Sequence, residues 1–452
     1  MTEVWAAILV CIVALSATLY LVRRGGGSLG MPVAYMIGLL LIHVPGAFAF
    51  VISNGAYSGS LTGGVDYVSR GIGLAAIGAA AFPFGVWLGR GRPSYELVRI
   101  GNFSSLGRQD FLRFCLIGGW CLAFGFTSLR NLASIGAAIN FGSSLWMLGV
   151  MLGLDQAVSR RNTRAVLLWF GALSVYPLFV LLFGGFLSYG ASAVILVLSL
   201  LFVRTRSYVW ALAAIAATVF LGMSVFVTYY ASRDEIRNVV WSGSSYAERI
   251  DVTTSVFSKI QLLNPSNPAH LKALDERLNQ NEFVGLSAER IQSGDADFLR
   301  GKSIREGIIA LVPRLVWPDK PVFGGSPKIV RDMTGLTLSE NTSFGVGNVM
   351  EFYINFGVWS LVGGFLCLGG LIGWLDKKSY DALQSGRPGD AIIFFLPCVA
   401  LIQPNGSIVE LASAAAASLV AAIGWRTLWN RYSERQAPNR ATRIRSRMNH
   451  GG

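Results

Sequence analysis

The sequence predicts an all-α polytopic membrane protein with about eleven transmembrane helices and one large helical loop on the outer face. Of the 452 residues, 53% are hydrophobic and only 14% are charged, and the mean hydropathy is +0.51. A soluble chain of this length needs more charge to cover its surface. The net charge of +13 does not predict a nucleic-acid partner, because short cytoplasmic loops of membrane proteins collect Lys and Arg.

Apolar runs along the chain supply the predicted spans. A helix rises about 1.5 Å per residue, so about 20 apolar residues cross the hydrocarbon layer. Runs of this kind lie at 4–22, 31–52, 66–88, 111–129, 141–158, 165–187, 190–203, 207–230, 350–374, 391–409 and 411–429. The first run has no Lys or Arg before it, so we interpret it as a span and not as a cleaved signal.

The connecting loops predict the orientation. Basic residues gather in alternate loops, and these are Arg23, Arg24, Arg90, Arg92, Arg99, Arg108, Arg160, Arg161, Arg164, Arg204, Arg206, Lys377, Lys378 and Arg387. The tail after Trp429 is also rich in Arg. Because Lys and Arg mark the cytoplasmic side, we expect the N-terminus outside and the C-terminus inside a bacterial inner membrane. The basic tail then lies beside anionic membrane lipid.

The chain divides into four parts on this interpretation. We expect a transmembrane bundle at 1–230, a large periplasmic or extracellular loop at 231–349, further spans at 350–430 and a basic cytoplasmic tail at 431–452. The loop holds as many acidic as basic residues. Short helices are predicted within it at 247–263, 270–279, 287–293 and 303–312, and the last is amphipathic and suited to the membrane surface.

Motifs for metal or nucleotide chemistry are missing from the sequence. There is no GxxxxGK[ST], HExxH or GxSxG pattern, and the three histidines, His43, His270 and His450, are far apart. The five cysteines lie in apolar runs without a CxxC pair. Asp295 and Asp297 form a D-x-D triplet, which we interpret as part of a solvated loop. We therefore predict neither a metal site nor a cofactor.

Residues 300–357 form the most informative stretch. Its centre reads VPRLVWPDKP, and the prolines hold an extended path that can fix the directions of Arg314 and Lys320. Trp317 suits either a membrane interface or stacking on a sugar. The residues alone leave two interpretations open, a substrate-binding turn and a structural turn whose basic side chains contact lipid headgroups.

Glu351 and Asn355 lie four residues apart, on one face at the outer end of a predicted span. A carboxylate at this depth is costly unless it is paired or faces a wet cavity, so Glu351 is a functional candidate. The alternative is a carboxylate at the water interface or in a structural ion pair.

Arginines near the outer ends of other spans could complete an anion site. Arg70 and Arg130 lie near the outer ends of two predicted spans, and Arg233 and Arg237 share a face of the helix after Tyr230. Guanidinium groups that converge would suit a phosphate. For each arginine alone, snorkelling to the interface is the simpler interpretation.

These residues resemble a known family. The "G-K-S … L-V-P-R-L-V-W-P-D-K-P" stretch, followed by "E-F-Y-I-N-F-G" at the start of a span, is similar to the Wzy-like oligosaccharide repeat-unit polymerases of O-antigen and exopolysaccharide. The layout of many spans and one late outer loop is also similar, and it resembles the GT-C-like polymerase and ligase architecture. The motif match covers about 300–357.

The resemblance implies a metal-independent glycosyltransferase that uses undecaprenyl-diphosphate-linked glycan as its substrate. The growing glycan would move from its carrier to the non-reducing end of a new lipid-linked unit. Arg305, Arg314 and Lys320 are then the diphosphate candidates. From its predicted position at the outer end of a span, and not from the resemblance, we expect Glu351 to assist the acceptor hydroxyl. A flippase and a chain-length regulator are the expected protein partners.

Two other functions stay open at this stage. A ligase of O-antigen type would have a similar layout, and a histidine in its large loop matters to it, but here the loop holds only His270, away from the basic motif. A flippase or transporter of lipid-linked glycan would need charged residues deep within several spans and little outer loop. This sequence shows the opposite distribution.

Overall fold

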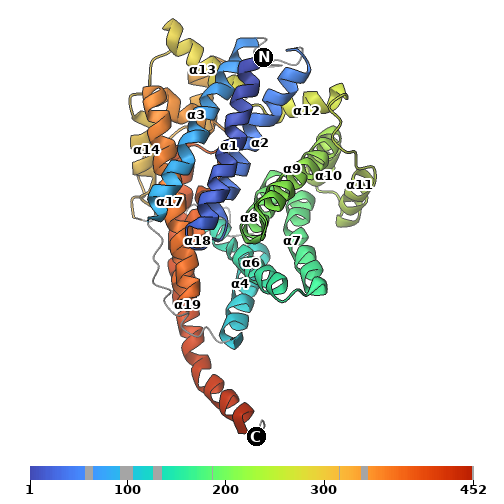
Figure 1. Ribbon diagram of the computed structural model, residues 1–452, viewed down its shortest axis with the longest axis vertical. Helices are drawn as coiled ribbons and strands as arrows, with labels where there is room; N and C mark the ends of the chain where they lie inside the picture. The colour runs from blue at the N-terminus through green and yellow to red at the C-terminus, as the bar shows by residue number, and fades with distance from the viewer. Residues whose placement is uncertain are drawn as a thin grey trace.

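The computed structural model describes residues 1–55, 65–91, 105–125, 135–185, 187–314, 316–336 and 345–449, and every regular element in these ranges is an α-helix. The helices form an elongated bundle, with a layer of shorter helices across one end and the last helix extending from the other (Figure 1).

The amino-terminal helices are α1 (Thr2–Arg24), α2 (Met31–Ile52) and α3 (Val65–Arg90), and α3 packs along α17 (Val358–Gln384). Glycines bring α3 and α17 close together. A Cβ atom at Gly89 would lie 1.9 Å from the Gly370 carbonyl oxygen. Small residues allow the backbones of membrane helices to approach closely, so van der Waals packing holds this pair.

The middle of the chain folds into six further helices, namely α4 (Ser105–Gly125), α5 (Ile135–Ser143), α6 (Leu145–Ser159), α7 (Thr163–Gly184), α8 (Ser188–Arg204) and α9 (Tyr208–Ala231). Asn162 and Ser207 cap α7 and α9, because their side chains accept hydrogen bonds from backbone N–H groups of the first turn.

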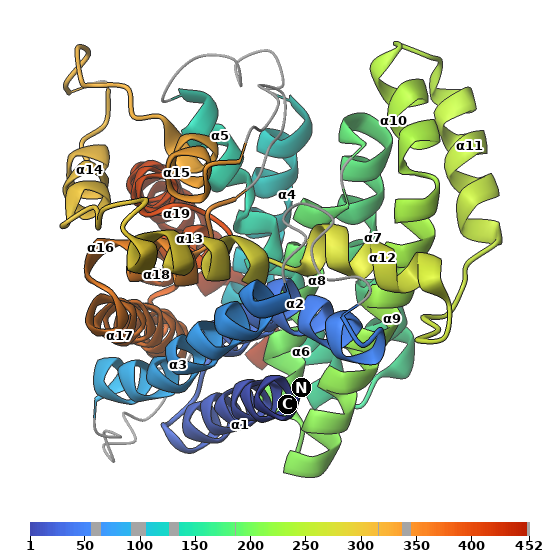
Figure 2. The ribbon, with the colours of Figure 1, turned by 90° about the horizontal axis from the view of Figure 1, so that it is seen from above.

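The outer layer consists of α10 (Arg233–Trp241), α11 (Tyr246–Ser258), α12 (Pro268–Leu278), α13 (Asn281–Ser293), α14 (Lys302–Ala310) and α15 (Gly325–Thr334). Seen from above, α12 and α13 cross α2 and α3 (Figure 2). The helices predicted within this loop are present, although the one expected at 247–263 ends at Ser258.

The predicted span at 350–374 is wrong in one respect, because the chain breaks at Gly357. The short helix α16 (Asn348–Phe356) ends there, and α17 begins at the next residue. Gly357 has φ 71° and ψ −147°, a conformation that essentially only glycine adopts. The span expected at 391–409 is also shorter, since α18 (Pro388–Leu401) stops before a turn that leads into α19 (Ile408–Asn449).

Eight of the described helical segments are long and apolar enough to cross a membrane. They are α1, α2, α3, the joined pair α5 and α6, α7, α9, α17 and the first part of α19, and α8 and α18 contain shorter apolar helices. The chain is therefore a helical multi-pass membrane protein.

The predicted basic loops gather at one end of the bundle. Arg90 at the end of α3 pairs with Asp376 of α17, and the guanidinium of Arg204 lies 5.7 Å from the ring centroid of Tyr380. Asp376 also accepts a hydrogen bond from the backbone N–H of Leu29. The turn after α1 and the last residues of α3 and α8 thus meet the end of α17, and we call this the basic end; Arg92 and Arg99 lie outside the described residues.

Candidate functional site

The informative stretch folds into one corner of the outer layer, where α14 and α16 meet the start of α19. Asn355 of α16 holds this corner together. Its Oδ1 accepts a hydrogen bond from Gly301 N at 3.1 Å, and its Nδ2 donates to Ser303 Oγ at 2.9 Å and to the Glu351 carbonyl at 2.7 Å. Asn355 is fully buried. It therefore positions the first turn of α14.

Glu351 lies beneath α14, one turn before Asn355, and its side chain is also fully buried. Glu351 Oε2 accepts a hydrogen bond from Ile408 N at 2.6 Å, in the first turn of α19. The positive end of a helix dipole stabilises a carboxylate at this position. The side chain of Ser303 from α14 is the other hydrogen-bonding group beside this carboxyl.

The environment of Glu351 favours its protonated form. The pKa of Glu351 is raised from 4.5 to about 7, chiefly by burial and to a smaller extent by the nearby carboxylates of Glu410 and Glu306, while hydrogen bonds from Ile408 N and Ser303 lower it. No Lys or Arg in the described ranges pairs with this carboxyl group. Glu351 can therefore take up or release a proton near neutral pH, which is what an acid–base group requires.

Glu410 stabilises the beginning of α19. Ser407 Oγ accepts a hydrogen bond from Glu410 N at 3.2 Å, while Glu410 Oε2 accepts one from Ser407 N at 2.9 Å. This reciprocal pair is a capping box, and the S-x-x-E spacing in the sequence is its signal. Ser326 of α15 donates to both Glu410 oxygens.

Arg314 and Lys320 bind carbonyl groups of their own turn. Lys320 Nζ donates to the carbonyl oxygens of Ala310 at 3.2 Å and Val312 at 2.8 Å, at the end of α14. Arg314 donates to the carbonyl oxygens of Pro318 and Pro321 at 3.2 and 3.4 Å. Burial, and then Arg314, lower the pKa of Lys320. In this conformation both cations stabilise the proline-rich turn.

The outward face of α14 is both apolar and basic. Ile304, Ile308 and Leu311 are 37%, 63% and 47% exposed and follow one another at helical spacing. Lys302 and Arg305 flank them, are exposed, and have no carboxylate partner among the described residues. We call these five residues the α14 surface. The opposite face, with Ser303, Gly307 and Ala310, is buried, and Gly307 packs directly on Ile408.

Trp317 lies in the turn that follows the α14 surface and is 43% exposed. Its neighbours Val316 and Val322 are 75% and 85% exposed. Exposed apolar and aromatic side chains at the end of a membrane bundle suit the lipid interface. The turn thus extends the apolar part of the α14 surface.

The other predicted arginines lie elsewhere. Arg233 and Arg237 are on α10, on the opposite side of the outer layer from α14 (Figure 2), so they do not join Arg305. Arg233 pairs with Asp234 and lies over the Tyr230 ring. Sequence separation cannot show which helices pack together, and that is why the expected convergence fails.

Arg70 and Arg130 complete the set of predicted arginines. Arg70 forms an ion pair with Glu289 of α13, which ties α3 to the outer layer. Arg130 lies outside the described residues.

A second polar cluster, which the sequence reasoning missed, lies at the outer end of α2. Pro45 has no backbone N–H and so interrupts the hydrogen bonds of this helix. Just before it, the carbonyl of Ile42 accepts from Gln280 N at 2.9 Å and the carbonyl of His43 accepts from Asn281 Nδ2 at 2.7 Å. His43 Nδ1 lies 2.8 Å from Asn281 Oδ1, and Asn281 also donates to Asn279. A proline within an apolar run was the available signal. The cluster attaches α12 and α13 to the bundle.

His270 is occupied by contacts within its own segment. Its Nδ1 accepts a hydrogen bond from Asn264 N at 3.1 Å, and its Nε2 lies 3.0 Å from Gln261 Oε1. In the described ranges, no group of three or more His, Cys, Asp or Glu side chains could hold a metal ion. No protein-family model, curated protein or solved structure matches this chain.

Proposed function

We propose that this protein polymerises undecaprenyl-diphosphate-linked oligosaccharide units into O-antigen or exopolysaccharide at the outer face of a bacterial inner membrane. On this proposal α4, α8 and α18 join the eight long apolar segments to give about eleven spans in a GT-C-like arrangement. The basic end faces the cytoplasm, and the layer α10–α15 faces outward.

The α14 surface is the observation that carries the proposal. It combines exposed aliphatic side chains with two cations, Lys302 and Arg305, that have no carboxylate partner in the described chain, and it lies next to α16 and the first turn of α19. A polyprenyl diphosphate has the complementary structure, an apolar chain attached to a doubly charged group. A guanidinium group binds phosphate oxygens with two parallel hydrogen bonds, so Arg305 is the best-placed diphosphate ligand.

The reaction on this surface is a substitution at an anomeric carbon. The hydroxyl oxygen of the acceptor unit forms the new bond, the bond to the diphosphate breaks, and undecaprenyl diphosphate leaves with both bonding electrons. The hydroxyl proton goes to Glu351. Because Glu351 lies beneath α14, against Ser303, this transfer requires α14 to move outward. Charge-assisted contacts from Arg305 then stabilise the leaving group.

Other parts of the corner have supporting roles. Arg314 and Lys320 hold the turn after α14 in shape, and Trp317 offers an aromatic face to a sugar or to lipid. Asn355 keeps the first turn of α14 above Glu351. The hydrogen bonds on both nitrogens of His270 do not favour a ligase that depends on a free loop histidine.

The test is polymer synthesis by purified protein supplied with lipid-linked repeat units from a strain that lacks this chain. Longer lipid-linked products are expected without any nucleotide sugar. If the purified protein moves the units across vesicle membranes but never lengthens them, the chain is a flippase. If the glycan instead appears on a different acceptor lipid, the chain is a ligase.

A further inference from the structure

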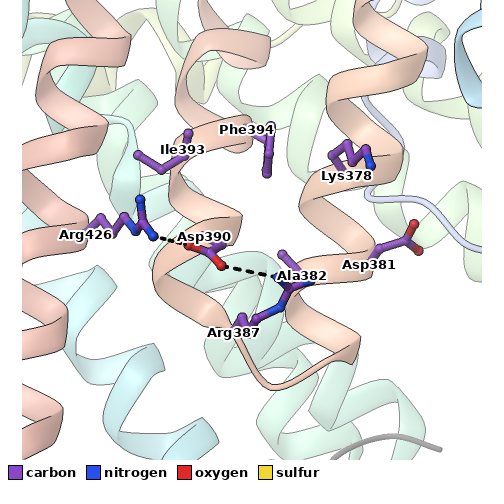
Figure 3. A pocket seen from close by; sticks show the side chains of 8 residues that line it. All are labelled: Lys378, Asp381, Ala382, Arg387, Asp390, Ile393, Phe394 and Arg426. Atoms are coloured by element: carbon purple, nitrogen blue, oxygen red, sulfur yellow. Dashed lines mark ion pairs between the residues drawn. The ribbon is translucent and has the colours of Figure 1, made fainter. Parts of the chain in front are cut away.

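A pocket of about 480 Å³ lies at the basic end, where α17, α18 and α19 meet (Figure 3). Lys378 lines it from α17, Arg387 from the turn before α18, and Arg426 from α19. Three segments of the chain thus each contribute one cation to a single hollow. The catalytic role proposed above uses none of these residues.

The charges in the pocket are only partly neutralised. Arg426 Nη2 lies 2.9 Å from Asp390 Oδ1, and Arg387 Nη1 lies 3.6 Å from Asp390 Oδ2, so two arginines share one carboxylate. The other carboxylate of the lining, Asp381, is paired with Lys377. In the part of the chain that the structure describes, Lys378 has no ion-pair partner. The pocket therefore retains positive charge for a further anion.

The pocket also has an apolar wall. Ile393 and Phe394 line it on α18, and Figure 3 shows both above Asp390, Arg387 and Arg426 and level with Lys378. Phe394 packs edge-to-face against Trp374, with the ring centroids 5.6 Å apart, and Trp374 is 41% exposed. An exposed tryptophan near the end of a span is typical of the headgroup level. The apolar wall of the pocket therefore contacts a residue typical of the headgroup level.

We infer that this pocket binds the phosphate group of an anionic phospholipid, with the glycerol backbone and the first methylenes against Ile393 and Phe394. Arg387 and Arg426 keep free N–H donors beyond their contacts to Asp390, and Lys378 adds three more donors. A free phosphate would satisfy the cations, but the apolar wall favours a lipid. The inference does not rest on the polymerase activity.

Native mass spectrometry of the full chain in detergent, titrated with dioleoyl phosphatidylglycerol, measures this binding. A basic residue near the headgroups contributes about 1 kcal/mol, or about 5-fold in affinity. We therefore expect Lys378→Gln to weaken the tightest phosphatidylglycerol site about 5-fold, and Arg387→Gln with Arg426→Gln to weaken it roughly 30-fold. Dioleoyl phosphatidylcholine is expected to bind weakly to all variants.

The control is Arg160→Gln with Arg164→Gln, two exposed arginines at the end of α6 and in the first turn of α7 that do not line the pocket. This pair removes the same charge and should leave the tight site unchanged. Lys378→Gln has no ion pair to break in the described chain, so it reports on binding even if the double arginine variant unfolds. Wild-type affinity in Lys378→Gln would overturn the inference. Displacement of the lipid by millimolar inorganic phosphate would show that the site recognises phosphate without lipid.

Discussion

Two buried carboxyl groups, one at each end of the bundle, have opposite surroundings. Asp376 at the basic end is fully buried and lies 2.6 Å from Arg90 Nη1, while its other oxygen accepts from Leu29 N at 3.0 Å. Arg90 donates further to the Gly27 carbonyl. Glu351 at the outer end is equally buried, but its nearest charged neighbours are other carboxylates.

This difference distinguishes a carboxylate that stabilises the fold, Asp376, from a carboxyl group that can exchange a proton, Glu351. Each polar atom of the Asp376 carboxyl group has a partner, so the ion pair locks the α1–α2 turn to α3 and α17. Glu351 is hydrogen-bonded at a helix end but has no cation paired with it in the described chain, so the fold stabilises it poorly as an anion. Buried groups with this kind of perturbed environment are concentrated at functional sites.

The largest effect is expected at the basic end. Asp376→Ala leaves the Arg90 guanidinium buried without its counter-charge, which typically costs about 3–5 kcal/mol. We expect the variant to accumulate poorly in membranes and to unfold at much lower temperature in detergent. Replacing both partners, by Arg90→Met with Asp376→Leu, should recover much of the loss. A wild-type melting temperature for Asp376→Ala would mean that the Arg90–Asp376 ion pair does not stabilise the fold.

The second effect is a pH dependence of stability due to Glu351. Its pKa is about 7 in the folded chain, against 4.5 as the ordinary value. Between these values the folded chain binds more protons than the unfolded chain, so the free energy of unfolding falls as pH rises, by about 3 kcal/mol over the whole interval.

Denaturation in detergent at pH 5 and at pH 7.5 measures this dependence. Glu351→Gln should remove this dependence, so we expect the free energy of unfolding to fall with rising pH in the wild type but not, for this reason, in the variant. If the free energy of unfolding changes equally with pH in the two proteins, Glu351 is ionised throughout this range.

The third effect concerns substrate. Arg305→Ala should reduce polymer synthesis about 10- to 150-fold, since a charge-assisted contact is worth roughly 1.5–3 kcal/mol. Protein abundance should not change, because Arg305 is exposed and forms no ion pair in the described chain. The control is Arg331→Ala, which removes an exposed arginine on α15 outside the α14 surface. Equal activity of the two variants would argue against the α14 surface as the diphosphate site.

The smallest effect is expected for Arg314. Its two contacts to proline carbonyls are long, at 3.2 and 3.4 Å, so Arg314→Ala should lower stability by only about 1 kcal/mol and activity in proportion to protein level. Quantitative immunoblotting together with glycan analysis gives activity per molecule. Complete loss of polymer at normal protein level would instead place Arg314 on the substrate.

Apolar runs predicted most of the spans because length and hydropathy decide whether a helix crosses a membrane. The break at Gly357 could not be predicted, since a glycine within an apolar run has the same appearance whether its φ is positive or negative. Glu351 and Asn355 were correctly placed on one helix face, because that relation depends only on helical spacing. The separation of Arg233 from Arg305 depends on which helices pack together, and local pattern does not contain that information.

The chain-length distribution of glycan made by Glu351→Gln tests the central proposal most directly. Gln keeps an oxygen to accept from Ile408 N, so the corner should fold, but it cannot take the acceptor proton. We expect the Glu351→Gln protein to reach normal abundance in the membrane, to make no long glycan chains and to leave single repeat units on their lipid carrier. Glycan chains of wild-type length from this variant would exclude Glu351 as the proton acceptor and contradict the proposed reaction.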